Sequence, residues 1–135
     1  MQRQVIIGAT PDDRRYTTKI MKWGSQGKLG DRVQVIDLED DRFYDSEGYL
    51  MKDQLSWTLK EAALVIVLVG DDNTDHPWLD WEGEFCHQWG IRRRLMRIPY
   101  TDGRLPEPFT VLQEIAYNPN AIEKELRPDM SRNYW

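Results

Sequence analysis

The feature that most constrains the fold is an uninterrupted run of eight apolar residues, Ala62–Val69, which ends at Gly70. Its last six residues, 64–69, are rich in β-branched side chains. A short, wholly apolar segment of this kind is typical of a strand that is buried on both faces of a parallel sheet. A membrane-spanning helix needs about twenty apolar residues. We therefore expect a central strand here and no membrane segment.

Segments with strand-like and helix-like patterns alternate on both sides of this run. Apolar segments predict further strands at residues 5–7, 33–38, 94–98 and 111–117. Apolar side chains at helical spacing predict helices from Thr10 to Gly24, along the stripe Met51, Leu55, Leu59 and Ala62, from Pro77 to Gly90, and over residues 121–126. Thr10 is a favourable capping residue, and Pro11 suits the first helical position. This alternation predicts a parallel sheet with helices on both faces.

We predict one domain over residues 1–135: a flavodoxin-like, three-layer α/β sandwich with five mainly parallel strands in the order 2-1-3-4-5. In such sheets, ligands bind beyond the carboxyl ends of the strands, where the strand order reverses. That point lies between strands 1 and 3. Functional residues are therefore expected at residues 8–13, at residues 70–77 and in the helix after Pro77.

Charge and cysteine content narrow the function further. The chain has 18 basic and 23 acidic residues and a net charge of −5, so we expect no nucleic-acid partner. Its one cysteine, Cys86, excludes an intramolecular disulfide and favours a reducing cytoplasm. The apolar stretch near the start is too short for a signal peptide. His76, Cys86 and His87 lack the spacing of a zinc site, so no metal is expected.

The segment from Trp78 to Trp89 holds the residues of greatest chemical interest. At about 100° per residue, one apolar sector of this helix contains Trp78, Trp81, Phe85, Cys86 and Trp89. Trp78, Phe85 and Trp89 are therefore expected to pack against the sheet or a neighbouring helix. Glu82 falls in the middle of that sector, where a carboxylate is costly unless it is hydrated or paired. Glu82 therefore either faces a pocket or pairs with an arginine of the run 92–94. The adjacent Gly83 allows close approach to the backbone, by a ligand or by a strand.

The order of these blocks resembles the Toll/interleukin-1 receptor (TIR) domain. The blocks are Phe43-Tyr44-Asp45, a helix, the strand ending at Gly70, and Trp78-Leu79-Asp80-Trp81-Glu82. The resemblance covers roughly residues 5–126. It is greatest to the stand-alone TIR-like proteins of bacterial Thoeris anti-phage defence.

The resemblance implies cleavage of NAD, as a substrate rather than a bound cofactor, between nicotinamide and ribose. Glu82 would be the catalytic residue, and the product would be ADP-ribose or a cyclic isomer that signals to a nucleotide-sensing effector. The implied substrate-binding residues are Thr10, Asp45, Asp71, Asn73 and Trp78. Thr10 stands near the end of strand 1, where the family usually has a serine or an aromatic residue. The same resemblance also allows a non-catalytic module that acts by self-association through TIR surfaces.

Two other classes share this kind of fold. A phosphoacceptor receiver domain needs acidic residues after strands 1 and 3, which Asp12, Asp13 and Asp71 partly imitate. It also needs a lysine after strand 5, and none occurs before Lys124. A nucleoside deoxyribosyltransferase-like enzyme also has an α/β fold and a catalytic glutamate, and the pattern leaves that alternative open.

Overall fold

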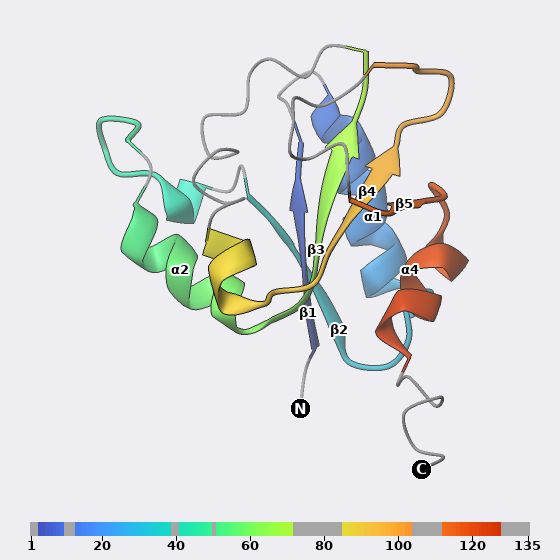
Figure 1. The fold of residues 1–135 in the computed structure, drawn as a ribbon, viewed down its shortest axis with the longest axis horizontal. Helices are drawn as coiled ribbons and strands as arrows, with labels where there is room; N and C mark the ends of the chain where they lie inside the picture. Colours follow the sequence, from blue (N-terminus) through green and yellow to red (C-terminus); the bar gives the residue numbers. More distant parts are fainter. Residues whose placement is uncertain are drawn as a thin grey trace.

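Five parallel strands form one sheet in the order β2-β1-β3-β4-β5, as the sequence predicts (Figure 1). The computed structural model describes residues 3–9, 13–38, 41–49, 51–71, 85–103 and 112–127. The strands are β1 (Arg3–Gly8), β2 (Val33–Asp37), β3 (Ala62–Val69), β4 (Arg93–Arg97) and β5 (Glu114–Ile115). This is a flavodoxin-like α/β arrangement, in which the order reverses between β1 and β3.

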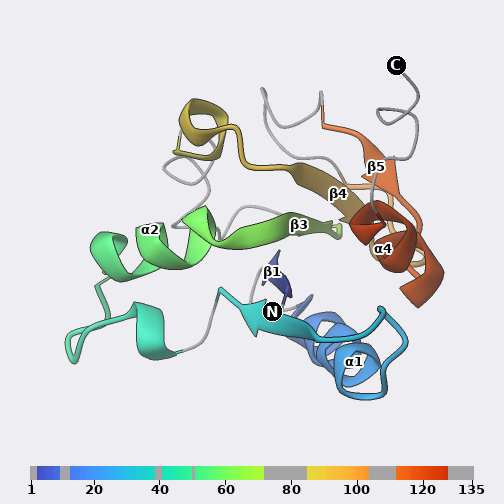
Figure 2. The ribbon, with the colours of Figure 1, turned by 90° about the horizontal axis from the view of Figure 1, so that it is seen from below.

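The central strand β3 is buried on both faces and contributes to two separate cores. Leu64, Ile66 and Leu68 pack with α1 (Arg14–Ser25) and α4 (Pro119–Leu126). Val65, Val67 and Val69 pack on the other side, with α2 (Lys52–Lys60) and the helical residues 85–89. Figures 1 and 2 show the resulting layers, with α1 and α4 on one face of the sheet and α2 on the other. No helix in the described parts of the chain has both the length and the apolar character needed to cross a membrane.

The first helix ends one residue beyond its predicted end. The α-helix begins at Arg14 after Asp13, whose side chain makes no capping hydrogen bond. Thr10, the predicted cap, lies outside the described residues. The helix extends past Gly24 to Ser25, and Gly24 allows a close approach of the helix to β2. A Cβ at residue 24 would lie only 2.9 Å from Cγ2 of Val35, so a larger residue would push the helix away from the strand.

The ends of α2 and β5 also differ from their predicted positions. The helical stripe was expected to include Ala62, but α2 ends at Lys60 and Ala62 begins β3. The fifth strand has only two residues, Glu114 and Ile115, instead of the seven expected over 111–117. It ends early because Asn118 already caps α4, with its side chain accepting a hydrogen bond from the backbone of Ala121. Helix α4 therefore begins at Pro119, which suits the first helical turn.

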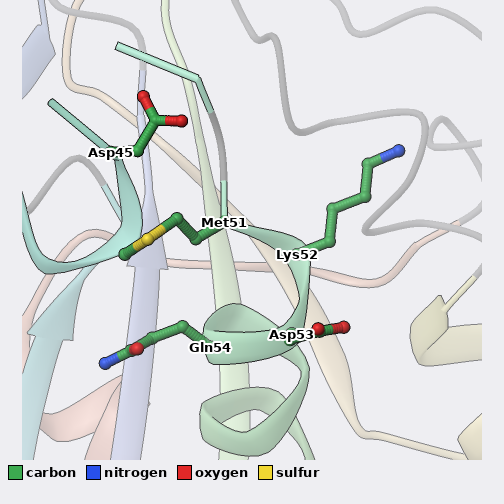
Figure 3. A pocket seen from close by; sticks show the side chains of 5 residues that line it. All are labelled: Asp45, Met51, Lys52, Asp53 and Gln54. Carbon is green, nitrogen blue, oxygen red and sulfur yellow. The ribbon is translucent and has the colours of Figure 1, made fainter. Parts of the chain in front are cut away.

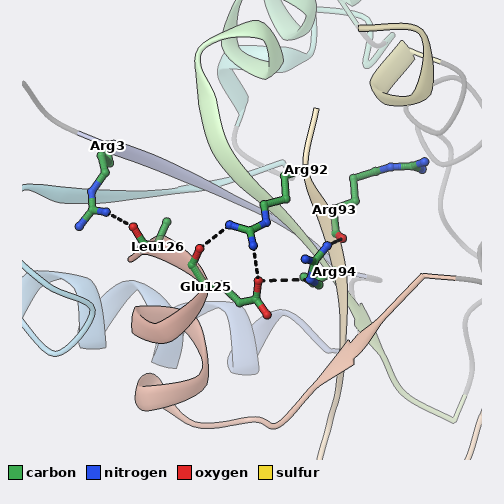
Figure 4. A network of polar contacts seen from close by, with 6 residues as sticks. All are labelled: Arg3, Arg92, Arg93, Arg94, Glu125 and Leu126. Atoms are coloured by element: carbon green, nitrogen blue, oxygen red, sulfur yellow. Dashed lines mark hydrogen bonds and ion pairs between the residues drawn. The ribbon is translucent and has the colours of Figure 1, made fainter. Parts of the chain in front are cut away.

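An arginine network holds the end of α4 at the edge of the sheet where the strands begin (Figure 4). Arg3 donates to the carbonyl oxygen of Leu126, and Arg92 Nη1 donates to that of Glu125 at 2.6 Å. Glu125 Oε2 lies 3.2 Å from both Arg92 Nη2 and Arg94 Nε. Cationic donors satisfy the last carbonyl groups of a helix and interact favourably with its dipole. Two of the three consecutive arginines thus anchor α4.

Candidate functional site

The carboxyl ends of β1 and β3 lie side by side, because Ile7 pairs with Ile66 and Gly8 with Val67. The other neighbour of β1 is β2. This switch point of the sheet is where open α/β folds bind their ligands. The described residues around it include three aspartates, Asp13, Asp37 and Asp71, each positioned in a different way.

Asp13 is held against the end of β3. A Cβ at residue 70 would lie 2.4 Å from Oδ2 of Asp13, so the carboxylate occupies the space that a side chain at Gly70 would need. Asp13 precedes the first residue of α1 but does not cap its own helix. Its carboxylate is therefore placed by the start of α1 and by the missing side chain of Gly70, directly at the switch point.

Asp37, the last residue of β2, is buried and paired. Its Oδ2 lies 3.2 Å from Nε of Arg14, and the two side chains are 7% and 55% exposed, respectively. The ion pair joins the end of β2 to the first residue of α1. A carboxylate removed from water requires such a partner. No role for Asp37 was predicted from the sequence, although it is a carboxylate at the end of an apolar strand.

Asp71 follows β3 directly and is tied to the loop after β4. Its Oδ1 accepts a hydrogen bond from the backbone N–H of Asp102 at 3.1 Å. The same loop is closed by the Thr101 hydroxyl, which donates to the carbonyl oxygen of Ile98 at 2.6 Å. Asp71 is exposed, so it lies at the carboxyl edge of the sheet with one oxygen engaged by a neighbouring loop.

Asp45 lies in a different place, beside the first turn of α2. Its Oδ1 accepts hydrogen bonds from the backbone N–H groups of Glu47 and Tyr49, both at 2.9 Å, which closes the loop between them. The hollow at this position has a volume of about 490 Å³ and is lined by Asp45, Met51, Lys52, Asp53 and Gln54 (Figure 3). Lys52 and Gln54 extend to opposite sides of the helix in Figure 3. Asp71 is not among the described residues that line this hollow.

The remaining predicted site residues, Thr10, Asn73, Trp78 and Glu82, lie outside the described residues, and their roles stay predictions. Of the helix predicted from Pro77 to Gly90, the structure describes helical residues 85–89, which test the predicted packing of Cys86 and Trp89. Cys86 is fully buried in the core, as expected for a small core residue. Trp89 lies against the neighbouring helix α2, as expected, but its side chain is 55% exposed rather than buried. Its ring packs on the ammonium group of Lys60, 4.1 Å from the ring centroid, and on Phe85 instead of on the sheet.

The arrangement suits a ligand that presents hydrogen-bond donors or positive charge. Ionised carboxylates accept hydrogen bonds only, and three of them border the carboxyl edge. No group of three or more His, Cys, Asp and Glu side chains within the described ranges is placed to hold a metal ion. No protein-family model matches the chain, and no curated protein matches it.

Proposed function

We propose that the chain is a TIR-like, NAD-cleaving enzyme, a hydrolase or cyclase of prokaryotic antiviral defence that acts in the cytoplasm. Its product would be ADP-ribose or a cyclic ADP-ribose-type signal for a nucleotide-sensing effector. The observation that carries the proposal is the strand order β2-β1-β3-β4-β5, together with the motif Trp78-x-x-x-Glu82 after β3. In this order, the segment that follows β3 leaves the sheet at its switch point.

Two of the three arginines that could pair with Glu82 are engaged elsewhere. Arg92 and Arg94 both lie 3.2 Å from the carboxylate of Glu125. Glu82 also precedes the fully buried Cys86 by four residues, which is about one helical turn. On a continuous helix, we expect Glu82 on the side of Cys86, facing the protein.

The proposed reaction needs one well-placed carboxylate. The bond between nicotinamide and C1′ of ribose breaks, and its electron pair neutralises the nicotinamide ring nitrogen. Positive charge develops at C1′, as in other glycosyl transfers. The Glu82 carboxylate stabilises this charge or orients the ribose hydroxyls. Water then adds to C1′ with loss of a proton, giving ADP-ribose, or a nucleophile of the same nucleotide adds and gives the cyclic product. Nicotinamide leaves as a neutral molecule, so no general acid is required.

The test compares two glutamate substitutions in the same segment. Wild-type protein incubated with NAD should release nicotinamide, and Glu82→Gln should lower the rate by about 10²–10³ because it removes only the charge. Glu84→Gln is the matched control and should retain activity, since residue 84 falls on the opposite side of the predicted helix. Both variants should unfold cooperatively. Full activity in Glu82→Gln, or no nicotinamide release by the wild type at any protein concentration, would contradict the proposal.

A second candidate is a non-catalytic, TIR-like assembly module. The observation that favours it is the exposure of two large aromatic side chains, Trp57 and Trp89, on neighbouring helical segments. Such side chains are enriched at protein interfaces. In this case, the protein should self-associate while the NAD assay shows no nicotinamide release in either the wild type or Glu82→Gln.

A further inference from the structure

Two exposed tryptophans border a groove between α2 and the helical residues 85–89. The side chains of Trp57 and Trp89 are 73% and 55% exposed. The groove has a volume of about 370 Å³, and its described lining residues are Asp53, Ser56, Trp57, Lys60, Phe85 and Trp89. Tryptophan side chains are enriched at protein contact sites.

The charges on α2 are arranged symmetrically about Trp57. Asp53, Trp57 and Lys60 share the helix face opposite the buried Leu55 and Leu59, because their spacing is i, i+4, i+7. Asp53 and Lys60 are two turns apart, or about 10 Å along the axis. Trp57 lies next to the midpoint between them. The face is therefore negative at one end, aromatic in the middle and positive at the other end.

We propose that this face of α2 is the interface of a symmetric dimer, in which α2 packs antiparallel against α2 of a second copy. A two-fold axis through the middle of the face brings Asp53 of each copy opposite Lys60 of the other. The same axis brings the Trp57 side chains of the two copies together at the centre. A parallel arrangement would instead oppose like charges. The pattern is thus self-complementary, as a two-fold interface requires.

These charges also have an explanation within one chain, which the test must separate from the dimer. Asp53 lies in the first turn of α2 and Lys60 in the last, so both interact favourably with the helix dipole. Lys60 also lies over the ring of Trp89. Among the described residues, however, no basic side chain forms an ion pair with Asp53. If the dipole explanation alone holds, reversing both charges should destabilise the folded protein more than reversing either one.

Charge reversal distinguishes the two explanations. Sedimentation of the wild type should show a concentration-dependent dimer, and Asp53→Lys and Lys60→Asp should each weaken dimerisation by at least about tenfold, because like charges then meet at both ends of the interface. Mixing the two single variants should restore dimers, since the first variant carries only positive charge at these two positions and the second only negative charge. The double variant should dimerise with itself, because opposite charges again meet at both ends. Lys28→Asp, an exposed substitution in the turn after α1, is the control and should leave dimerisation unchanged.

Three outcomes would overturn the proposal. These are a monomeric wild type at its highest soluble concentration, dimerisation unaffected by the single reversals, and failure of the mixed variants to associate. If a reversed variant does not fold, Trp57→Ala tests the same face, because it truncates an exposed side chain. A folded Trp57→Ala that dimerises like the wild type contradicts the proposal. Mass in solution is the readout throughout, so the result does not depend on NAD cleavage.

Discussion

The carboxylate of Asp13 occupies the position that a side chain at Gly70 would need. A Cβ at residue 70 would lie 2.4 Å from Oδ2 and 3.0 Å from Cγ of Asp13. The contact joins the start of α1 to the end of β3 at the point where the strand order reverses. An acidic group and a missing side chain, 57 positions apart along the chain (70 − 13), together shape the proposed site.

Gly70→Ala should destabilise the protein by about 1 kcal/mol, because the added methyl group forces the carboxyl end of the Asp13 side chain from its position. A double-mutant cycle with Asp13→Ala tests the cause. In the Asp13→Ala background, the cost of Gly70→Ala should largely disappear. Urea unfolding of the four proteins gives the coupling free energy. Additive effects of the two substitutions would show that the strain lies elsewhere.

Thr17→Val should stabilise the protein by about 1 kcal/mol. Thr17 is fully buried in α1, and its Oγ1 has no hydrogen-bond partner among the residues that the structure describes. Burying an unsatisfied hydroxyl costs free energy that an isosteric methyl group does not. Thr18→Val is the neighbouring control, because the exposed hydroxyl of Thr18 donates to the carbonyl oxygen of Arg14. Denaturant unfolding should give a higher midpoint for the first variant alone. A lower midpoint for Thr17→Val would argue against the unsatisfied hydroxyl.

Glu125→Gln should lower the free energy of unfolding by about 1–3 kcal/mol, because its carboxylate binds Arg92 and Arg94 together. Glu123→Gln makes the same substitution two residues earlier in α4. Within the described part of the chain, the ion pair of Glu123 is the exposed i,i+4 pair with Arg127, and such surface pairs contribute little. Thermal unfolding in low and high salt measures both variants. Equal losses in the two variants would show that the arginine network does not hold α4.

Stability should fall as the pH rises from 10 to 12, in part because of Tyr117. Burial, with a smaller contribution from Tyr16, raises the pKa of Tyr117 from 10.0 to about 12. In this range, the unfolded chain has lost the phenolic proton while the folded protein keeps it, so the unfolded state is favoured. Tyr117→Phe removes the group that titrates. Unfolding at pH 9 and pH 11 should therefore show a smaller loss for Tyr117→Phe than for the wild type, and an identical loss would contradict this assignment.

Most of the fold could be predicted because its signals are local. The β-branched run 64–69 is apolar at every position and ends at Gly70, which favours a short strand covered on both faces over a buried helix. The helical periodicity between successive strands indicates strand–helix–strand connections, which join parallel strands. The strand order and the two-sided burial of β3 followed from these patterns. The short fifth strand did not, because Asn118 and Pro119 begin a helix before the predicted strand ends.

The candidate site was less predictable, because its contacts join residues far apart in the sequence. The type and spacing of residues located the switch point and singled out Glu82, but they did not indicate that Asp13 meets Gly70 or that Asp37 pairs with Arg14. Periodicity places a side chain on one face of its own helix. It does not determine where the neighbouring element ends.

The sequence by itself determined the order of the elements, the burial of β3 and the edge of the sheet at which a ligand is expected. Tertiary structure decided which polar and aromatic groups meet. Two of three adjacent arginines bind Glu125 because α4 ends beside β4. Trp89 stays largely exposed because it packs on Lys60 at the end of α2 rather than on the sheet. Backbone propensity and hydrophobic periodicity act over a few neighbouring residues. The contacts of Glu125 and Trp89 instead depend on how the helices pack on the folded sheet.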